Sequence, residues 1–290
     1  MTNTASTVRT AVAVSLDHLL AAVRELRIGG RWERASVLLD AAEVTDPSAR
    51  ARLAVAAAEV SLESDWFGGT SLARARLDAA EKAFAGAHRH DRWDLDCLWL
   101  RHDYLGLVHI DGSFRPGPDG KDPKALAALR SRAENLRERA PDDVRRGWAE
   151  MYLGLIADNL FAERDLAPGH YETALRTADS AEPADPLLAR EALRHLGDHD
   201  HDHGDHARAL ERWSRATELG ARAGAVPGTL SQQMLLAVLA RDAGDEAGAA
   251  ALAREVARWA KAIGAADTEA QANGFLAGVD PTAPPAESGS

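Results

Sequence analysis

The strongest constraint on the fold is that three stretches of the chain resemble one another. They read DYLGLVHIDG at 103–112, MYLGLIADNL at 151–160 and RHLGDHDHDHGD at 194–205. Self-similarity at a period of roughly 20–50 residues is the signature of proteins built from stacked supersecondary units, each of which buries its apolar face against its neighbours. We therefore expect a stack of similar units.

A second helical segment follows these stretches, with small residues and one aromatic residue three or four positions apart. Residues at that spacing share one face of a helix, and small side chains let paired helices approach closely. Similar patterns occur at 29–42, 67–80 and 243–256. Together they predict about six antiparallel helix pairs. The defining positions of the two clearest segments are Ala167, Tyr171 and Ala174, and Ala209, Trp213 and Ala216.

Turn and cap residues agree with helix pairs. An aspartate before a proline places an N-capping carboxylate ahead of a residue whose missing N–H costs nothing at the first helical position. This occurs at Asp46-Pro47, Asp122-Pro123 and Asp185-Pro186, where we expect helices to begin. Glycines between the two halves of a pair supply the permissive backbone of a tight turn. They are Gly30, Gly68, Gly204 and Gly244.

Composition narrows the class of protein further. Alanine, leucine and arginine dominate while aromatic residues make up 5%, so we expect an almost entirely helical, all-α chain without strands. A formal net charge of −11 argues against nucleic acid as a direct partner. Cys97 is the single cysteine, which excludes an intramolecular disulfide and a cysteine-cluster metal site.

The start of the chain, MTNTASTVRTAVAVSLDHLL, lacks a basic region followed by a long apolar stretch. No later apolar run reaches the ~20 residues that span a bilayer. We expect a cytoplasmic protein that does not engage a membrane, and its oligomeric state stays open.

The segment around the third stretch resembles a tetratricopeptide repeat (TPR). It matches the leucine-glycine pair of that repeat at Leu196-Gly197, its turn glycine-aspartate at Gly204-Asp205, and its small and aromatic columns. The resemblance covers roughly 16–264. It implies a right-handed α-solenoid whose first helices line a concave groove, and a family role in binding peptides or other partners. We expect one such domain at 15–276, between a flexible terminus at 1–14 and a disordered tail at 277–290.

Carrying the repeat register over the chain places a set of polar side chains in one concavity. An acid-rich groove of this kind suits cationic groups or proton transfer, because clustered carboxylates raise one another's pKa. A groove that is acidic only for solubility is the alternative. The predicted ligand-binding residues are Asp103, Asp158, Asn159, Arg194, Asp198, His201 and Asp202.

The stretch RHLGDHDHDHGDH also carries metal-ligand spacing. Histidines three or four residues apart share a helix face, as His199 and His203 do, and as His195 and His199 do with Asp202. Zinc, nickel or copper would suit such a set. The alternative is a solvated, charged helix end.

The functional hypotheses therefore differ in class. The favoured one is a binding module for a peptide, a protein partner or a small metabolite. The alternative is an enzyme that uses the same groove for metal-assisted or acid–base cyclisation or elimination, although the chain has no nucleophile or cofactor motif. Trp213 is expected in the core, Trp66 and Trp148 near the groove, and Phe114 at the tip of the enlarged turn DGSFRPGPDG.

Overall fold

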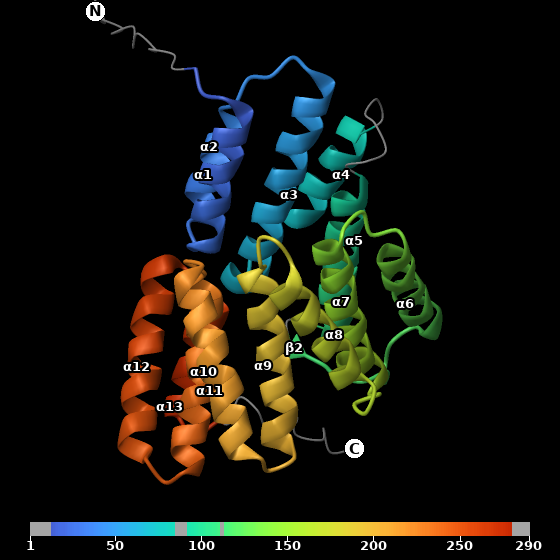
Figure 1. The fold of residues 1–290 in the computed structure, drawn as a ribbon. Helices are drawn as coiled ribbons and strands as arrows, with labels where there is room; N and C mark the ends of the chain where they lie inside the picture. Colours follow the sequence, from blue (N-terminus) through green and yellow to red (C-terminus); the bar gives the residue numbers. More distant parts are fainter. Residues whose placement is uncertain (1–12, 85–91, 111–112, 280–290) are drawn as a thin grey trace, which may run out of the picture.

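The computed structural model describes residues 13–84, 92–110 and 113–279 (Figure 1). Most of the predicted flexible terminus and disordered tail therefore lies outside the described residues. The described residues form thirteen helices and one pair of short strands. The helices are α1 (Leu16–Ile28), α2 (Trp32–Asp40), α3 (Pro47–Gly68), α4 (Ala73–Phe84), α5 (Arg92–Val108), α6 (Pro123–Glu138), α7 (Asp143–Phe161), α8 (Ala167–Ser180), α9 (Pro186–Asp202), α10 (His206–Arg222), α11 (Val226–Asp242), α12 (Glu246–Ile263) and α13 (Ala266–Leu276).

Successive helices pack as six pairs, from α1 with α2 to α11 with α12, and α13 packs on the last pair. The expected all-α solenoid is confirmed. The expectation of no strands is wrong at one place: β1 (His109–Ile110) pairs antiparallel with β2 (Ser113–Phe114). The enlarged turn between α5 and α6 is long enough for the chain to reverse and pair with itself.

The predicted helix starts are confirmed. The side chains of Asp46, Asp122 and Asp185 each accept a hydrogen bond from a backbone N–H in the first turn of α3, α6 and α9. Turn glycines at 30, 204 and 244 adopt positive φ values of 73°, 80° and 84°. Gly68 differs, because it is the last residue of α3 and Gly69 takes the left-handed position, with φ 66°.

The leucine-glycine pairs have a direct packing role. A Cβ on Gly154 would lie 2.4 Å from the ring of Tyr171, and a Cβ on Gly197 would lie 2.4 Å from Nε1 of Trp213. The glycines thus let an aromatic ring of the second helix lie against the backbone of the first. Gly106 has no such neighbour within 4 Å, so the first of the three stretches keeps the sequence pattern without this contact.

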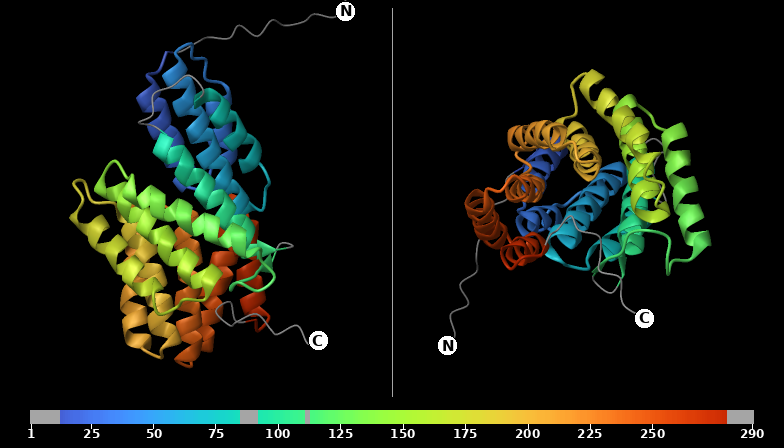
Figure 2. Two further views of the ribbon diagram at one scale, coloured as in Figure 1. Left: turned by 90° about the vertical axis from the view of Figure 1, so that its right-hand side faces the viewer. Right: turned by 90° about the horizontal axis from the view of Figure 1, so that it is seen from below.

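The two ends of the stack meet. One apolar core contains Val23 and Trp32 from the first pair together with Met234 and Phe275 from the last helices. A Cβ on Gly30 would lie 3.1 Å from Pro227, which shows how closely the α1–α2 turn approaches α11. Figure 2 shows α1 and α2 above the C-terminal helices, with the pairs arranged around a common axis.

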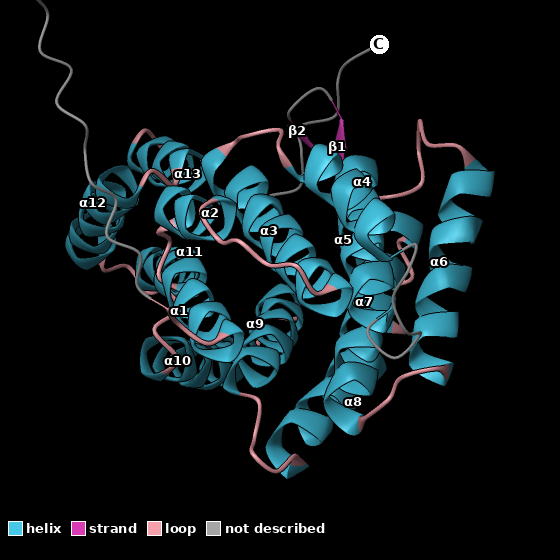
Figure 3. Cartoon of the chain, turned by 90° about the horizontal axis from the view of Figure 1, so that it is seen from above, coloured by secondary structure: helices cyan, strands magenta, loops and turns pink. Residues whose placement is uncertain are grey.

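The first helices of the pairs form the inner layer. α3 contacts α5, α5 contacts α7, and α7 contacts α9, while α13 contacts both α11 and α3. Figure 3 shows this arrangement from above, with α9 and α3 on the inside and α6, α8 and α12 outside. The last helix, α13, contacts α3, which is the first helix of the second pair. The solenoid therefore encloses its inner face.

Candidate binding site on the inner face

Charged side chains from successive first helices are neighbours across the interior. The guanidinium of Arg27 on α1 forms ion pairs with Glu59, at 3.2 Å, and with Glu63, both on α3. Burial raises the pKa of the Glu63 carboxyl, while the charges of Arg27 and Arg101 oppose the rise. Residues of α1, α3 and α5 are therefore close enough for their charges to act on one another.

The same chain of neighbours continues to α7 and α9. Burial raises the pKa of the Tyr152 phenol on α7 to about 12, the positive charge of Arg101 lowers it, and the charge of Glu191 on α9 adds to the rise. We call the residues that link these five helices the inner charged face. They are Arg27, Glu59, Glu63, Arg101, Tyr152, Glu191, Arg194 and Asp198.

On α9 this face continues as a column of charged residues at helical spacing. Arg194, Asp198 and Asp202 follow one another at every fourth position and so share one side of the helix. Burial raises the pKa of Asp198 to about 6, the guanidinium of Arg194 opposes this, and the carboxylates of Asp202 and Asp158 add to it. Asp198 is therefore poised to exchange a proton near neutral pH.

Trp213 bonds to the first two residues of this column. Its indole Nε1 donates to the backbone oxygen of Arg194 at 2.9 Å and to Oδ1 of Asp198 at 3.1 Å. The expected core position of Trp213 is confirmed, since its side chain is fully buried. The core aromatic residue of the repeat thus also orients the carboxylate of Asp198.

A second network joins α7, α8 and α9. Asp158 accepts hydrogen bonds from Nε2 of His199 at 2.9 Å and from the hydroxyl of Tyr171 at 3.3 Å. Arg164, in the turn before α8, lies 3.6 Å from Asp158 and donates to Asp202 at 2.5 Å. Asp158 and Asp202 are thereby held around the same guanidinium.

Two further predicted groove residues, Asn159 and Asp103, lie on different sides of α5. Asn159 donates to the hydroxyl of Tyr104 at 2.8 Å, between α7 and α5. Asp103 lies on the side of α5 that faces α6, where it accepts from His102 at 3.1 Å and from Arg132 at 2.5 Å. Burial acts to raise the pKa of Asp103, but these two hydrogen bonds lower it overall.

His201 also points elsewhere, for a reason that the repeat makes clear. It lies four residues after Gly197, as Asp158 lies four residues after Gly154, and both side chains turn toward the next first helix. Nε2 of His201 is 3.8 Å from Asp242, the last residue of α11. The structure therefore brings Asp158, Asn159, Arg194, Asp198 and Asp202 toward one region, and places Asp103 and His201 outside it.

The histidines with predicted metal-ligand spacing make separate contacts. The ring of His195 stacks on Tyr171, with centroids 5.2 Å apart, and burial lowers its pKa well below the usual value, together with the charge of Arg194. Nε2 of His199 bonds to Asp158, and Nδ1 of His203 bonds to the backbone oxygen of His199 at 2.6 Å. Asp202 bonds to Arg164.

Several buried polar atoms on α9 and α11 have no hydrogen-bond partner among the described residues. They include both amide atoms of Gln232 on α11 and Nε of Arg190 and Arg194 on α9. The Gln232 side chain is fully buried. Buried polar groups are nearly always paired, and exceptions mark places where a polar ligand or water completes the bonding.

Sequence reasoning did not select Glu63, Arg190 or Gln232. Each lies in a first helix directly beside another polar residue, as in SLESD for Glu63, LAREA for Arg190 and LSQQM for Gln232. The local pattern therefore does not distinguish these residues from exposed polar ones. The partner of Glu63, on another repeat, was not visible in the sequence.

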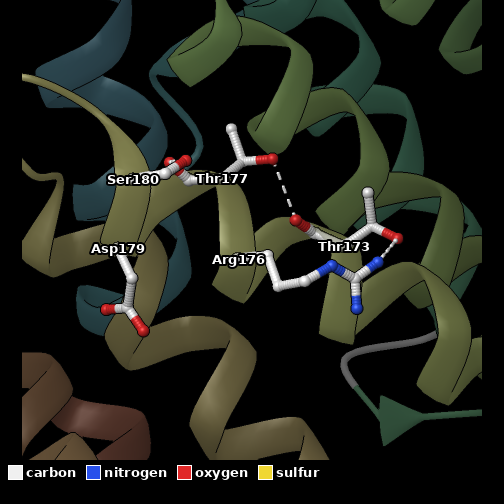
Figure 4. Close-up of a pocket in the computed structure, with 5 residues that line it drawn as sticks. All are labelled: Thr173, Arg176, Thr177, Asp179 and Ser180. Carbon is white, nitrogen blue, oxygen red and sulfur yellow. Dashed lines mark hydrogen bonds between the residues drawn. The ribbon is translucent and has the colours of Figure 1, made fainter.

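Two other surface features carry less chemistry. A shallow hollow along α8 is lined by Thr173, Arg176, Thr177, Asp179 and Ser180 (Figure 4). Its threonines and Arg176 bond within the helix, at 2.9 and 3.0 Å.

At the enlarged turn, the half-exposed rings of Trp66 and Phe114 flank His109, with centroids 5.2 and 5.8 Å away. Trp148 donates from its indole to Asp185 at 3.1 Å.

The fold resembles solved helical structures. Fourteen chains match, among them a Rap protein complexed with Competence and Sporulation Factor, with a TM-score of 0.58 and 10% identity over 90% of this chain and 70% of that one. This likeness supports a TPR-like helical repeat. No family model matches the sequence, and no curated protein does. None of the helices in the described part of the chain has the length and apolar character needed to cross a bilayer.

Proposed function

We propose that this protein is a binding module that takes up a peptide segment of a partner on its inner charged face. The observation that carries the proposal is the column of Arg194, Asp198 and Asp202 on α9, in which the pKa of Asp198 is raised to about 6 and Nε of Arg194 has no hydrogen-bond partner among the described residues. A peptide backbone supplies both a donor and an acceptor at each residue, which suits the Asp198 carboxylate and the Arg194 guanidinium.

The charges of the face support a polar ligand. Arg101 and Arg194 offer forked donors that suit a carboxylate, while Glu191 and Asp198 suit an ammonium or guanidinium group. A ligand with both signs of charge, such as a peptide, matches this face better than a purely cationic one. A protein of similar fold, the Rap protein, is complexed with Competence and Sporulation Factor, which supports a ligand-binding role for such a stack.

Some of the predicted groove residues lie beside the proposed binding site. Asp158 and Asn159 border the α9 column through their contacts with His199 and Tyr104. Asp202 is the last member of the column and accepts from Arg164. These residues form the border of the proposed site. Asp103 and His201 have no part in it, because they face α6 and α11.

The test uses a library of short synthetic peptides with free termini, selected on the immobilised full chain and identified by mass spectrometry. The best-enriched peptide is then titrated by fluorescence polarisation against wild type, Arg194→Gln and Asp198→Asn. Loss of a buried charged partner is expected to weaken binding by about 2–5 kcal/mol. Glu211→Ala, an exposed residue on α10, is the control and should bind as wild type does.

The proposal fails if no peptide is enriched, or if the two inner-face variants bind as tightly as Glu211→Ala does. Circular dichroism of each variant guards against loss of fold. Asp198→Asn is isosteric, and Arg194→Gln keeps a polar side chain on the same helix face.

Catalysis is a second candidate, favoured by one observation. Asp198, with a pKa of about 6, can accept or release a proton near neutral pH. If Asp198→Asn retains ligand binding but abolishes conversion of the bound compound, the site is an active site. Mass spectrometry of the bound compound before and after incubation distinguishes the two functions.

A further inference from the structure

We propose that His201, His206 and Asp242 form a binding site for a divalent transition metal ion such as zinc, which joins two neighbouring repeats. This site lies apart from the proposed peptide site and does not depend on it. His201 lies near the end of α9, His206 is the first residue of α10, and Asp242 is the last residue of α11. One ligand atom of each lies within 4.8 Å of the others.

The repeat explains why these three side chains meet. The turn Asp202-His203-Gly204-Asp205 is followed one repeat later by Asp242-Ala243-Gly244-Asp245. In both turns the glycine has a positive φ and the second aspartate caps the next helix. Asp242 is therefore the counterpart of Asp202, and stacking places it beside His201 of the preceding repeat. No single turn supplies all three ligands.

The separation of the ligand atoms suits a shared ion. Nε2 of His201 lies 3.8 Å from a carboxylate oxygen of Asp242, which is too long for a hydrogen bond. Ligand atoms at 2.0–2.2 Å from a tetrahedral zinc ion lie about 3.3 Å from one another. A small rotation of the exposed side chains of Asp242 and His206 closes the difference.

His201 is the fixed member of the set. Its side chain is only 13% exposed, and its ring centroid lies 5.5 Å from that of Trp213 and 5.1 Å from that of His206. Nδ1 of His201 is buried without a partner among the described residues. The other ring nitrogen, Nε2, is the one that faces Asp242. A rigid imidazole with two adjustable ligands is a sound basis for a three-ligand site.

The types of ligand atom at this site indicate which metal ions it would bind. Two imidazoles and one carboxylate suit zinc, nickel and copper, whereas calcium and magnesium prefer oxygen ligands alone. Three protein ligands leave a fourth position for water or another ligand. An ion here would tie α9 and α10 to α11, and so would stabilise the stacking of these two repeats.

The experiment titrates Zn²⁺ into the chelator-treated full chain by isothermal calorimetry. We expect one bound ion per chain, with affinity weakened at least about tenfold in His206→Ala and in Asp242→Ala. His203→Ala is the matched control, because this exposed histidine lies in the same turn but bonds to the backbone of His199. Its zinc affinity should equal that of wild type.

A second readout locates the ion. Paramagnetic Cu²⁺ at His201 should broaden the indole NMR signal of Trp213, assigned with Trp213→Phe, before those of the other tryptophans. The broadening should disappear in Asp242→Ala. The site is refuted if wild type binds no zinc, if both ligand variants bind as wild type does, or if His203→Ala loses as much affinity as they do.

Discussion

The indole ring of Trp213 packs against Gly197, so close that a Cβ on the glycine would lie 2.4 Å from Nε1. This contact sets the distance between α9 and α10. It also places the indole N–H where it reaches both Arg194 and Asp198. Packing of the repeat and presentation of the inner face are therefore coupled through one residue.

Gly197→Ala is expected to destabilise the fold by about 1–3 kcal/mol, because the added methyl group forces the indole or the helix to shift. Gly106→Ala is the matched control. Gly106 is an exposed helical position where an added methyl group would have no neighbour within 4 Å, so alanine there should stabilise by roughly 0.5–1 kcal/mol. Urea unfolding measures both. Equal effects of the two changes would contradict this packing role.

Trp213→Ala should cost about 3–5 kcal/mol, because it leaves a large cavity between α9 and α10. Trp213→Phe retains most of the apolar volume but removes the N–H that bonds to Arg194 and Asp198. We expect a smaller loss of stability for the phenylalanine variant, together with weaker binding of the selected peptide. A loss below about 1 kcal/mol for Trp213→Ala would show that the ring does not fill the inter-helix space.

The raised pKa of Asp198 predicts a dependence of stability on pH. The folded chain holds the Asp198 proton up to a pKa of about 6, above the value of 3.8 for an unperturbed carboxyl. Between these values the folded state binds more protons than the unfolded state, so this group lowers the free energy of unfolding as pH rises. Asp198→Asn should therefore be more stable than wild type at pH 7, by about 1–3 kcal/mol.

The difference should vanish as the pH approaches 4, which denaturant unfolding at a series of pH values will show. His195 contributes in the opposite direction, because burial lowers its pKa and favours the neutral form. Nδ1 of His195 lies 3.5 Å from Oδ2 of Asp198, so the comparison is made in a His195→Gln background, where position 195 does not titrate. Stability of the variant that equals wild type throughout would contradict the burial of the Asp198 charge.

Contact between the two ends of the stack can be tested by cross-linking. A Cβ on Gly69 would lie 3.8 Å from the carboxylate of Asp267 on α13. A chain with Gly69→Cys and Asp267→Cys should form an intramolecular disulfide on mild oxidation, because position 69 lies against the side chain at position 267. Burial raises the pKa of the native Cys97 thiol to about 12, so it should not compete.

The control pairs Asp267→Cys with Gly224→Cys, which replaces an open turn glycine between α10 and α11. It should form no intramolecular disulfide. A non-reducing gel and mass spectrometry distinguish the products. Absence of the disulfide in the first pair would show that α3 and α13 do not stay together in solution.

Local pattern alone determined the helix pairs of this protein. The Asp-Pro caps, the turn glycines and the small residues of the second helices act within one repeat, so the chain near each residue contains the whole physical cause. Trp213 was predictable as a core residue for the same reason. The column of Arg194, Asp198 and Asp202 followed from helical spacing, because residues four apart share a side of the helix.

Only the tertiary structure decided which repeats and side chains meet. His201 turns toward Asp242 because the next first helix lies beside it, and Asp103 turns toward Arg132 because α6 covers that side of α5. The ion pairs of Arg27 with α3, and the contact of α13 with α3, join segments far apart in the chain. Such contacts depend on the rotation between successive repeats, which accumulates over the whole stack and is not encoded in any one of them.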